Sequence, residues 1–585
     1  MSEEKRNCQN CKNPFTVEPE DFAFYQKMAV PPPTFCPECR MIRRAIFFSN
    51  RTLFRAKDAL TGKEIFSGLP PGTPIKIYDK EYWWSDAWDP MAYGRDYDFS
   101  RPFFAQFRDL MYDVPWPSRQ VQRLINSDYS NNAGDLKNCY LCFDTGLCED
   151  SAYLVNGNNN KNCFDTTTSG KGELNYDSLL IEACFQTFFS YACEECRNVW
   201  LSRNCVGCSD CFGCANLRHK QYYIFNQPYT KESYAEELKR MNLGSHMELA
   251  TARERAHDVW RTHPYKYMFG YRNAGVTGDW MMHAKNVRHS FNVTETEDSA
   301  FCQNILMGVK DSYDFTVWGD RCEMIYEAVQ TGEGCRNIKF TKDCCSADSY
   351  IEYSFDCHSS SNLFGCMGLR KKQYCIFNRQ YTNEDYHALR ERIVRHMSDM
   401  PYADAGGRTY RYGEFFPPDF SPLAYNESFA QDLLPLTREQ AETRGYLWRE
   451  PEMRAHQISS AARDLPDHIR DVDDAVLKET IGCISCGRAY RIIAQELAFL
   501  RQMSLPLPRL CPECRYRERA APRNPVRFYH RRCQCTGEAS SNGIYENIAD
   551  HVHGTSPCAK EFETIYAEDK KEIIYCESCY NAEAV

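Results

Sequence analysis

Residues 162–205 read NCFDTTTSGKGELNYDSLLIEACFQTFFSYACEECRNVWLSRNC, and this stretch decides the fold. Short apolar or cysteine-bearing segments recur in it about every 10–13 residues, and Asn, Asp, Gly and Ser separate them. Larger landmarks stand 21–24 residues apart, at Cys139, Cys163, Cys184 and Cys205. This spacing predicts coils of about two strands each, stacked as a β-solenoid. A β-sandwich has similar strand spacing and is the alternative.

The region around this stretch is repeated. Residues 211–234, CFGCANLRHKQYYIFNQPYTKESY, match residues 363–386, LFGCMGLRKKQYCIFNRQYTNEDY, at an offset of 152. Each copy ends in a segment with helical character, KESYAEELKRMNL in the first and NEDYHALRERIVRHM in the second. We therefore expect a mainly β, duplicated, cysteine-rich core in which a helix caps the open end of each copy.

The two ends of the chain also repeat each other, at an offset of 475. Each end carries two CxxC pairs separated by 24 residues, and DFAFYQKMAVPPPTFCPECR aligns with ELAFLRQMSLPLPRLCPECR. Two such pairs supply four thiolates, the tetrahedral ligand set of a closed structural zinc site. The apolar spacing between the pairs predicts a helix, which the following prolines end. The predicted ligands are Cys8, Cys11, Cys36, Cys39, Cys483, Cys486, Cys511 and Cys514.

A second zinc site is predicted after the C-terminal ribbon. Its expected ligands are Cys533, Cys535, Cys576 and Cys579, and His551, His553 or Cys558 could replace one of them. In the N-terminal copy, two local alignments place Asp58 and Leu60, and Asp79 and Tyr82, at the four cysteine positions. The first copy is thus expected to lack its second metal, with Trp83 and Trp84 filling the core instead.

These repeats divide the chain into seven parts. A zinc ribbon at each end flanks the duplicated core, and a degenerate second ribbon and a linker complete the order. The predicted parts are 1–57 (zinc ribbon), 58–120 (degenerate second ribbon and linker), 121–270 and 271–420 (β repeat copies with their helices), 421–475 (linker), 476–530 (zinc ribbon) and 531–585 (second zinc ribbon).

The run CVGCSDCFGC at residues 205–214 has the cysteine spacing of an iron–sulfur motif. Its counterpart in the second copy reads CHSSSNLFGC, in which Ser360 and Leu363 replace the two middle cysteines. Leucine cannot ligate a metal, so packed thiols are the favoured interpretation. A zinc or an iron–sulfur site formed by Cys205, Cys208, Cys211 and Cys214 remains as the alternative.

Several motifs together resemble those of a family of large cysteine-rich zinc-ribbon proteins predicted from genomes of uncultivated small-celled bacteria. The motifs are EPEDFAFYQKM, PPPTFCPECR, YWWSDAWDPMAYGRDYDFSRPFF, FGCANLRHKQYYIFNQPY and SPLAYNESFAQDLLPLT. The resemblance covers nearly the whole chain. It implies zinc ribbons at the ends and no established activity. The chain departs from the pattern in its missing second N-terminal ribbon and in the fewer cysteines of the second central copy.

Composition limits the possible functions. The chain has 585 residues, 32 cysteines and a formal charge of −10, and 43% of its residues are hydrophobic. It shows no long apolar run and no apolar leader at its start, so we expect a cytoplasmic protein without a membrane span. In a reducing compartment so many cysteines indicate metal sites or buried thiols. No nucleotide-binding, nucleophile-elbow or metalloprotease motif is found, which favours a non-enzymatic protein without deciding the question.

One basic region stands out in this acidic chain. Residues 478–538 contain 12 Lys and Arg against 5 Asp and Glu. Arginine and aromatic residues alternate there and at the N-terminal counterpart, a composition typical of nucleic-acid contacts. The alternative is that these arginines form ion pairs with the acidic middle of the chain. The candidate nucleic-acid-binding residues are Arg40, Arg43, Arg44, Arg515, Arg517, Arg531 and Arg532.

The leading functional hypothesis is a non-enzymatic scaffold or adaptor with about three zinc ions per chain. Its partner would be RNA, DNA, a ribonucleoprotein or another protein. A redox or metal-handling protein centred on Cys205–Cys214, with iron–sulfur as its cofactor, is the first alternative. A structural protein that assembles with copies of itself is the second, and the sequence leaves the oligomeric state open.

Overall fold

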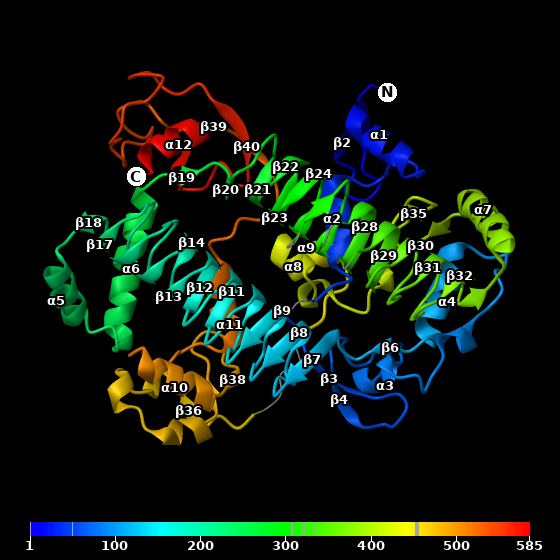
Figure 1. The fold of residues 1–585 in the computed structure, drawn as a ribbon, viewed down its shortest axis with the longest axis horizontal. Helices are drawn as coiled ribbons and strands as arrows, with labels where there is room; N and C mark the ends of the chain where they lie inside the picture. The colour runs from blue at the N-terminus through cyan, green and yellow to red at the C-terminus, as the bar shows by residue number, and fades with distance from the viewer. Residues whose placement is uncertain are drawn as a thin grey trace.

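The computed structural model describes residues 2–49, 51–305, 308–319, 322–332, 334–450 and 456–584. It is strand-rich, with two large sheets surrounded by helices and small hairpins (Figure 1). Of the predicted linker 421–475, residues 451–455 lie outside the described part of the chain. No helix in the described ranges is both long and apolar enough to cross a bilayer.

The first large sheet, here called the first stack, is built from 12-residue coils. Its strands run parallel and pair at an offset of 12, as in Val121 with Ala133 and Ala133 with Thr145. The predicted coil of 21–24 residues is therefore wrong, because the cysteine landmarks are inward residues that lie on different sides of the coils and do not mark the coil length. The strands are β7 (Val121–Ile125), β8 (Asn131–Lys137), β9 (Phe143–Glu149), β10 (Val155–Asn158), β11 (Phe164–Gly170), β12 (Tyr176–Glu182), β13 (Phe185–Phe188), β14 (Tyr191–Glu194), β15 (Arg197–Trp200), β16 (Ser209–Phe212) and β17 (Gln221–Ile224).

The corners of these coils explain the residues that separate the apolar segments. Every third residue has a left-handed backbone, for example Asn138 (φ 54°), Leu141 (φ 50°) and Asp144 (φ 54°). Four such corners divide a coil into sides of three residues. Asn and Asp adopt this conformation at the least cost among residues with a side chain, so they recur at the corners. Their side chains also bond from coil to coil, as Asn138 Nδ2 does to Asp150 Oδ1 at 2.9 Å.

The residue after each corner points into the stack, and in the first stack it is small at most corners. The thiol of Cys163 donates to the carbonyl oxygen of Lys161 at 3.3 Å, two residues earlier. The hydroxyl oxygen of Ser151 accepts the backbone N–H of Cys163 from the next coil at 3.0 Å. Cysteine suits this narrow interior because it is a small hydrophobe with a weak donor.

The second large sheet, the second stack, repeats this plan with wider coils in its middle. Gly278 pairs with Ser290 at an offset of 12, whereas Gln303 pairs with Thr316 at an offset of 13. Buried Phe315, Ile325 and Ile338 lie in its interior. The strands are β20 (Gly270–Tyr271), β21 (Gly278–Met282), β22 (Lys285–Arg288), β23 (Ser290–Thr294), β24 (Thr296–Ala300), β25 (Gln303–Ile305), β26 (Val309–Lys310), β27 (Thr316–Trp318), β28 (Glu323–Gly332), β29 (Arg336–Cys345), β30 (Ser349–Glu352), β31 (Ser361–Phe364) and β32 (Gln373–Ile376).

Each stack ends in an antiparallel hairpin followed by a helix, and both expected helices are present. The added strand is β18 (Gln227–Pro228) in the first stack and β33 (Arg379–Gln380) in the second. Thr230 and Thr382 then accept a backbone N–H as the N-caps of the following helices. These helices are α5 (Lys231–Met241), with α6 (His246–Thr262) after it, and α7 (Asn383–Asp399).

The terminal regions dock crosswise on the stacks (Figure 1). Helix α2 (Pro37–Ala45), near the N-terminus, packs on β27 and β28 of the second stack. Helix α11 (Pro512–Ala520), near the C-terminus, packs on β11 and β12 of the first stack. The remaining terminal elements are β1 (Glu4–Asn7), β2 (Pro14–Val17), α1 (Pro19–Lys27), β37 (Ile481–Gly482), β38 (Ala489–Tyr490), α10 (Ala494–Gln502), β39 (Tyr529–Arg532), β40 (Glu561–Thr564), β41 (Ile574–Tyr575) and α12 (Glu577–Glu583).

The connecting segments contain only short helices and strands. Residues 54–117 contain a hairpin and helices that pack near the end of the second stack, where α4 contacts α7. Their elements are β3 (Phe54–Lys57), β4 (Glu64–Ser67), β5 (Ile77–Tyr78), α3 (Lys80–Trp84), α4 (Phe103–Asp113) and β6 (Trp116–Pro117). Between the stacks and in the linker lie β19 (Tyr265–Lys266), β34 (Tyr402–Ala403), β35 (Thr409–Tyr410), α8 (Ala430–Leu433), α9 (Arg438–Thr443) and β36 (Ser460–Ala461).

Candidate metal centres

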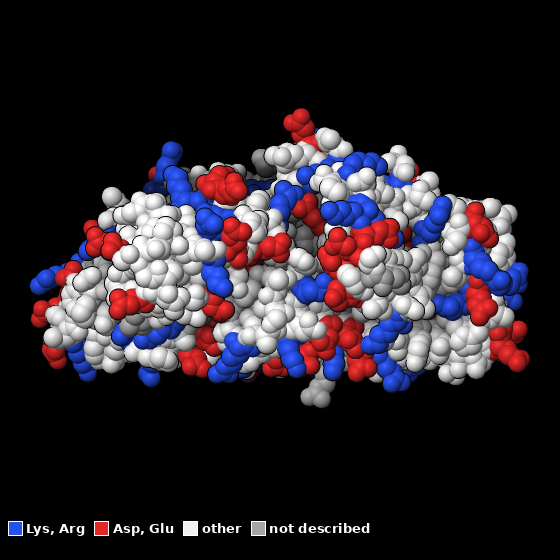
Figure 2. Space-filling view, turned by 90° about the horizontal axis from the view of Figure 1, so that it is seen from above, with Lys and Arg blue, Asp and Glu red and all other residues white. Residues whose placement is uncertain are grey.

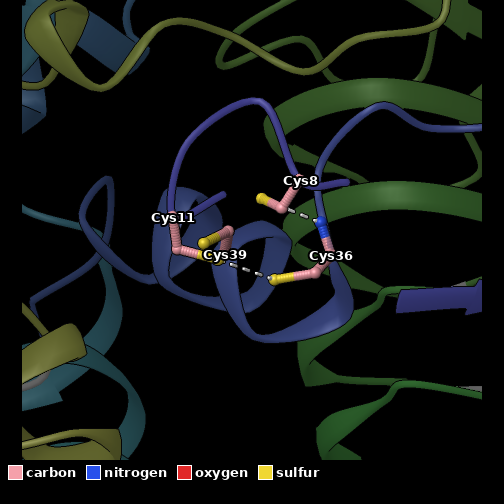
Figure 3. Close-up of side chains that lie close together, drawn as sticks. All are labelled: Cys8, Cys11, Cys36 and Cys39. Atoms are coloured by element: carbon pink, nitrogen blue, oxygen red, sulfur yellow. Dashed lines mark hydrogen bonds between the residues drawn. The ribbon is translucent and has the colours of Figure 1, made fainter. Parts of the chain in front are cut away.

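The N-terminal cysteines converge on one point (Figure 3). The hairpin of β1 and β2 carries Cys8 and Cys11, while Cys36 is the N-cap of α2 and Cys39 lies in its first turn. The four sulfurs all lie within 4.8 Å of one another. Cys8 Sγ accepts the backbone N–H of Cys36 at 3.3 Å, and the sulfurs of Cys11 and Cys36 are 3.7 Å apart. This N-terminal cluster has the ligand set that the sequence predicted.

The second predicted cluster has the same geometry. Cys483, Cys486, Cys511 and Cys514 also lie within 4.8 Å of one another. The N–H of Cys511 donates to Cys483 Sγ at 3.3 Å, and the sulfurs of Cys486 and Cys511 are 3.7 Å apart. The predicted helix between the CxxC pairs is present in both regions, as α1 and α10.

The third predicted cluster needs a correction. Cys533, Cys576 and Cys579 converge as expected, and the fourth sulfur of the group is that of Cys558, one of the three expected substitutes, in place of Cys535. Cys535 lies in a different group, with His551, His553 and Cys579. The reason is the spacing of one residue between Cys533 and Cys535, which in extended chain turns their side chains to opposite sides. Cys558 takes the place because its backbone N–H bonds to the carbonyl of Cys535 at 2.9 Å.

Each cluster stabilises one thiolate, the form that binds metal. Hydrogen bonds with Cys36 and Cys39 hold the pKa of Cys8 well below its usual range. Burial raises the pKa of Cys483, but the backbone N–H groups of Cys486 and Cys511 lower it to about 7 overall. The pKa of Cys576 is lowered to about 4, chiefly by its hydrogen bond with Cys533.

The cysteines of the run 205–214 point into the first stack. Cys205, Cys208, Cys211 and Cys214 each follow a corner and occupy the four sides of a single 12-residue coil. Their thiols donate to carbonyl oxygens two residues earlier, at 3.3–3.7 Å. Within the described ranges, groups of three or more ligand atoms within 4.8 Å of one another occur only in the two terminal regions.

In the N-terminal copy a carboxylate stands where the C-terminal cluster has a thiolate. Asp58 Oδ1 accepts the backbone N–H of Asp79 at 3.1 Å. At the aligned positions, Cys533 Sγ accepts the N–H of Cys576 at 3.2 Å. Trp83 is fully buried and its indole N–H donates to the carbonyl of Pro115 at 3.0 Å, as expected for a core residue. Trp84 is 43% exposed, so its expected place in the core is wrong.

The arginines that follow the N-terminal cluster are internal. Arg40 and Arg44, one helical turn apart on α2, both pair with Asp314 of the second stack, at 3.0 and 2.9 Å. Arg44 Nε also donates to Thr316 Oγ1 at 3.2 Å. The guanidinium of Arg40 lies over the ring of Phe301, 5.0 Å from its centre. All of these polar side chains are buried.

The same arrangement recurs at the other end of the chain. Arg515 and Arg519 of α11 both pair with Asp165 of the first stack, at 2.6 and 3.4 Å. Arg519 Nε donates to Thr167 Oγ1 at 3.0 Å, and Arg515 lies 4.6 Å from the ring centre of Tyr153. Each member is the sequence counterpart of one in the N-terminal arrangement. We call the two arrangements the N-terminal and C-terminal arginine clamps.

These contacts show where the seven candidate nucleic-acid-binding arginines lie. Of the seven candidate residues, Arg40, Arg43, Arg44 and Arg515 are buried in ion pairs with the stacks and their neighbours. Arg517 and Arg532 are exposed and pair with Glu513 and Glu561, and Arg531 donates to the carbonyl of Ala567. On the face shown in Figure 2, basic and acidic side chains are interspersed. That face offers no extended basic patch.

The sequence analysis did not predict the two clamps. Their signal was present as two arginines four residues apart after each second CxxC, and as FDT at 164–166 beside YDF at 313–315. The alternative prediction, that these arginines form ion pairs with the acidic middle of the chain, did not identify Asp165 or Asp314 as the partners. Finding them required knowing that each terminal helix docks on the stack farther from it in sequence.

Neither a scan against protein-family models nor a search of curated proteins returns a match to this chain. Its class therefore follows from the fold and the sites alone. The chain is a strand-rich protein with several cysteine clusters that could each bind a metal ion.

Proposed function

We propose that this protein is a non-enzymatic zinc-binding scaffold in which zinc ribbons lock two β-solenoids, the stacks, together. The observation that carries the proposal is the duplicated coupling of a cysteine cluster to an arginine clamp. Cys36 and Cys511 are both the N-cap residues of the clamping helices, α2 and α11. A metal on these thiolates would fix the start of each helix, and the arginines of the next turns bind the stack.

Zinc is the metal that the donor sets favour. Closed all-thiolate sites with four ligands are typical of structural zinc, and they leave no position for a substrate. Without a metal ion, the four sulfurs could not all be thiolates at these distances, because their negative charges would repel one another. Metal binding would therefore supply much of the folding free energy of these terminal regions, which have few regular elements of their own.

Removing the metal from the intact protein tests this function. We expect chelation to increase backbone hydrogen exchange in α2 and α11 and in the coils that they contact. Cys36→Ser should do this in α2 alone and Cys511→Ser in α11 alone, each with the loss of one zinc ion per chain. Cys139→Ser, at an inward position of the first stack, is the matched control and should retain all of the zinc.

Two results would overturn the proposal. One is a protein that holds no zinc when it is purified without chelator. The other is exchange in α2 and α11 that stays unchanged after the zinc is removed, because the clamps would then dock without the metal.

A further inference from the structure

One thiol near the C-terminus belongs to two ligand groups at once. Cys579 Sγ lies within 4.8 Å of the sulfurs of Cys533, Cys558 and Cys576, and also within 4.8 Å of the ligand atoms in the second group. The two groups share no other member. Cys579 is 1% exposed and lies in the first turn of α12, between the two groups. The other members of the second group are Cys535, His551 and His553.

The two histidines of the second group are held as metal-ligating histidines are. His551 Nε2 contacts Glu583 Oε1 at 2.9 Å, and His553 Nδ1 contacts the carbonyl oxygen of Ser556 at 2.6 Å. An oxygen acceptor on one ring nitrogen fixes the tautomer and leaves the other nitrogen for a ligand. The remaining nitrogen of His553, Nε2, lies 3.3 Å from Cys579 Sγ.

The carboxylate behind His551 is itself fully bound. Glu583 is 4% exposed, and it accepts from Tyr545 Oη at 2.8 Å and from the N–H groups of Ile548 and Ala549 at 2.9 and 3.2 Å. Glu583 lies four residues after Cys579, so one face of α12 carries both the shared thiol and the support of a histidine. The side chains of His551 and Glu583 are each 1% exposed, and burying the Glu583 carboxylate would be costly without these hydrogen bonds.

We propose that this region holds a binuclear zinc centre in which the thiolate of Cys579 bridges the two ions. Cys533, Cys558 and Cys576 complete the first ion, and Cys535, His551 and His553 complete the second. The proposal rests on the proposed zinc-binding function and extends it. Two zinc–sulfur bonds of about 2.3 Å that meet at a near-tetrahedral angle place the ions about 3.8 Å apart.

Charge and spacing both support two ions over one. Five thiolates and two neutral imidazoles around two Zn²⁺ carry a net charge of −1, less than the −2 of a closed four-thiolate zinc site. The single residue between Cys533 and Cys535 sends their side chains to opposite sides, one toward each ion. A single ion would leave a buried thiol and two prearranged histidines without a function.

The full-length protein tests this by its zinc content and by X-ray absorption at the zinc edge. We expect four zinc ions per chain, one for each ligand group, and a zinc–zinc distance of about 3.8 Å. His553→Gln should lower the content to three and remove the zinc–zinc signal, and Cys579→Ser should lower it to two. The matched control is His530→Gln, an exposed histidine beside Glu561, which should leave both measurements unchanged.

The outcomes separate this inference from the function on which it rests. Three zinc ions per chain without a zinc–zinc signal would overturn the binuclear centre alone, since the N-terminal and Cys483 clusters would still be filled. A four-zinc protein in which His553→Gln loses no metal would overturn it as well. The absence of zinc from the two all-cysteine ribbon sites would instead overturn the proposed function. The zinc–zinc distance is measured on the wild-type protein, so this test does not depend on whether the variants fold.

Discussion

The two arginine clamps share the same arginine, aspartate and threonine contacts and differ in the further ion pairs around them. In both, two arginines on successive turns pair with one buried aspartate, and the second arginine also binds the threonine two residues after that aspartate. In the C-terminal clamp, Arg515 also pairs with Glu496 at 2.6 Å and Arg519 with Asp177 at 3.0 Å. Between the arginines, the N-terminal helix has Arg43, and the C-terminal helix has Glu518 at the aligned position. Arg43 pairs with Glu327 of the second stack at 2.6 Å and with Glu414 at 2.8 Å.

This difference shows how the repeated unit was adapted to its neighbours. Glu414 belongs to the chain that leaves the second stack after α7, so the N-terminal clamp also fastens this connecting segment. Glu518 is exposed, and desolvation raises the pKa of its carboxyl. The shared residues dock the helix, and the differing residue decides whether a further segment is held.

The largest expected effect comes from removing the shared aspartate of each clamp. Asp314→Ala leaves the buried guanidiniums of Arg40 and Arg44 without their carboxylate partner. After Asp165→Ala, Arg515 still pairs with Glu496 and Arg519 still pairs with Asp177. Breaking a buried ion pair from one side costs about 3–5 kcal/mol of the free energy of unfolding. We expect Asp314→Ala to cost more than Asp165→Ala, because Arg515 and Arg519 each keep a second carboxylate partner and, among the described residues, Arg40 and Arg44 do not. Urea unfolding of both variants measures the difference.

The control for this prediction lies on the outer face of α11. Arg517 pairs with Glu513 four residues earlier, and its side chain is 69% exposed. Arg517→Ala should change the free energy of unfolding by less than about 0.5 kcal/mol. If Asp314→Ala or Asp165→Ala were equally mild, the clamps would be incidental contacts.

A second comparison lies inside the stacks, at an inward position where the copies differ. The first stack has Cys196 there, and the second has Asp348, which is fully buried. Burial raises the pKa of Asp348 to about 8, although backbone N–H groups of Ser360 and Cys345 partly oppose it. The folded protein thus keeps a proton that the unfolded chain releases near pH 4.

This pKa gives a pH dependence with a definite sign. Because the folded state binds more protons than the unfolded state between about pH 4 and 8, the free energy of unfolding falls as the pH rises through that window. The loss is on the order of a few kcal/mol. Asp348→Asn, which keeps an acceptor for the N–H of Ser360, should be more stable than the parent at pH 8.5 and not at pH 5. Parallel pH profiles for the two proteins would contradict a raised pKa.

The sequence allowed much of the metal chemistry to be predicted, because ligand spacing is a local property. Eight of the twelve predicted cysteine ligands fall into the first two of the three all-cysteine clusters, and three more fall into the third. The error at Cys535 arose because a CxC pair was treated like a CxxC knuckle, although extended chain separates alternate side chains. The loop that brings Cys558 into the cluster has no such local pattern.

The coil length and the docking of the ends were harder to predict. A period of 12 was hidden because the conspicuous cysteines fill only some of the inward positions, with Ser, Asn and Thr in the others. The Asn and Asp residues at the left-handed corners follow the 12-residue period, but in the sequence such residues are typical of turns between strands. Crosswise docking depends on pairs such as Arg40 with Asp314, which are 274 residues apart and leave no local signal.

A smaller effect is expected at the CxxC knuckles. Lys12 follows Cys11 with a left-handed backbone (φ 66°), and Gly487 stands at the matching position with φ 71°. A residue with a side chain costs about 1 kcal/mol in this conformation. Lys12→Gly should therefore stabilise the N-terminal region by somewhat less than that, since glycine loses more entropy on folding. Gly487→Lys should destabilise the other ribbon, and thermal unfolding of the two variants should shift in opposite directions.

The smallest effect is expected at Cys208, because the second stack has a serine, Ser360, at the aligned position. Cys208 donates to the carbonyl of Val206, and in the second stack Ser360 donates to the carbonyl of His358 at 3.0 Å. A hydroxyl can replace the thiol in this place, so Cys208→Ser should cost less than about 1 kcal/mol. If the run 205–214 only packs the coil, the variant will also keep the metal content of the parent, as measured by elemental analysis of anaerobically purified protein. The loss of iron or zinc together with a visible absorption band would show instead that these four thiols form a metal centre, and that the two stacks differ in chemistry as well as in width.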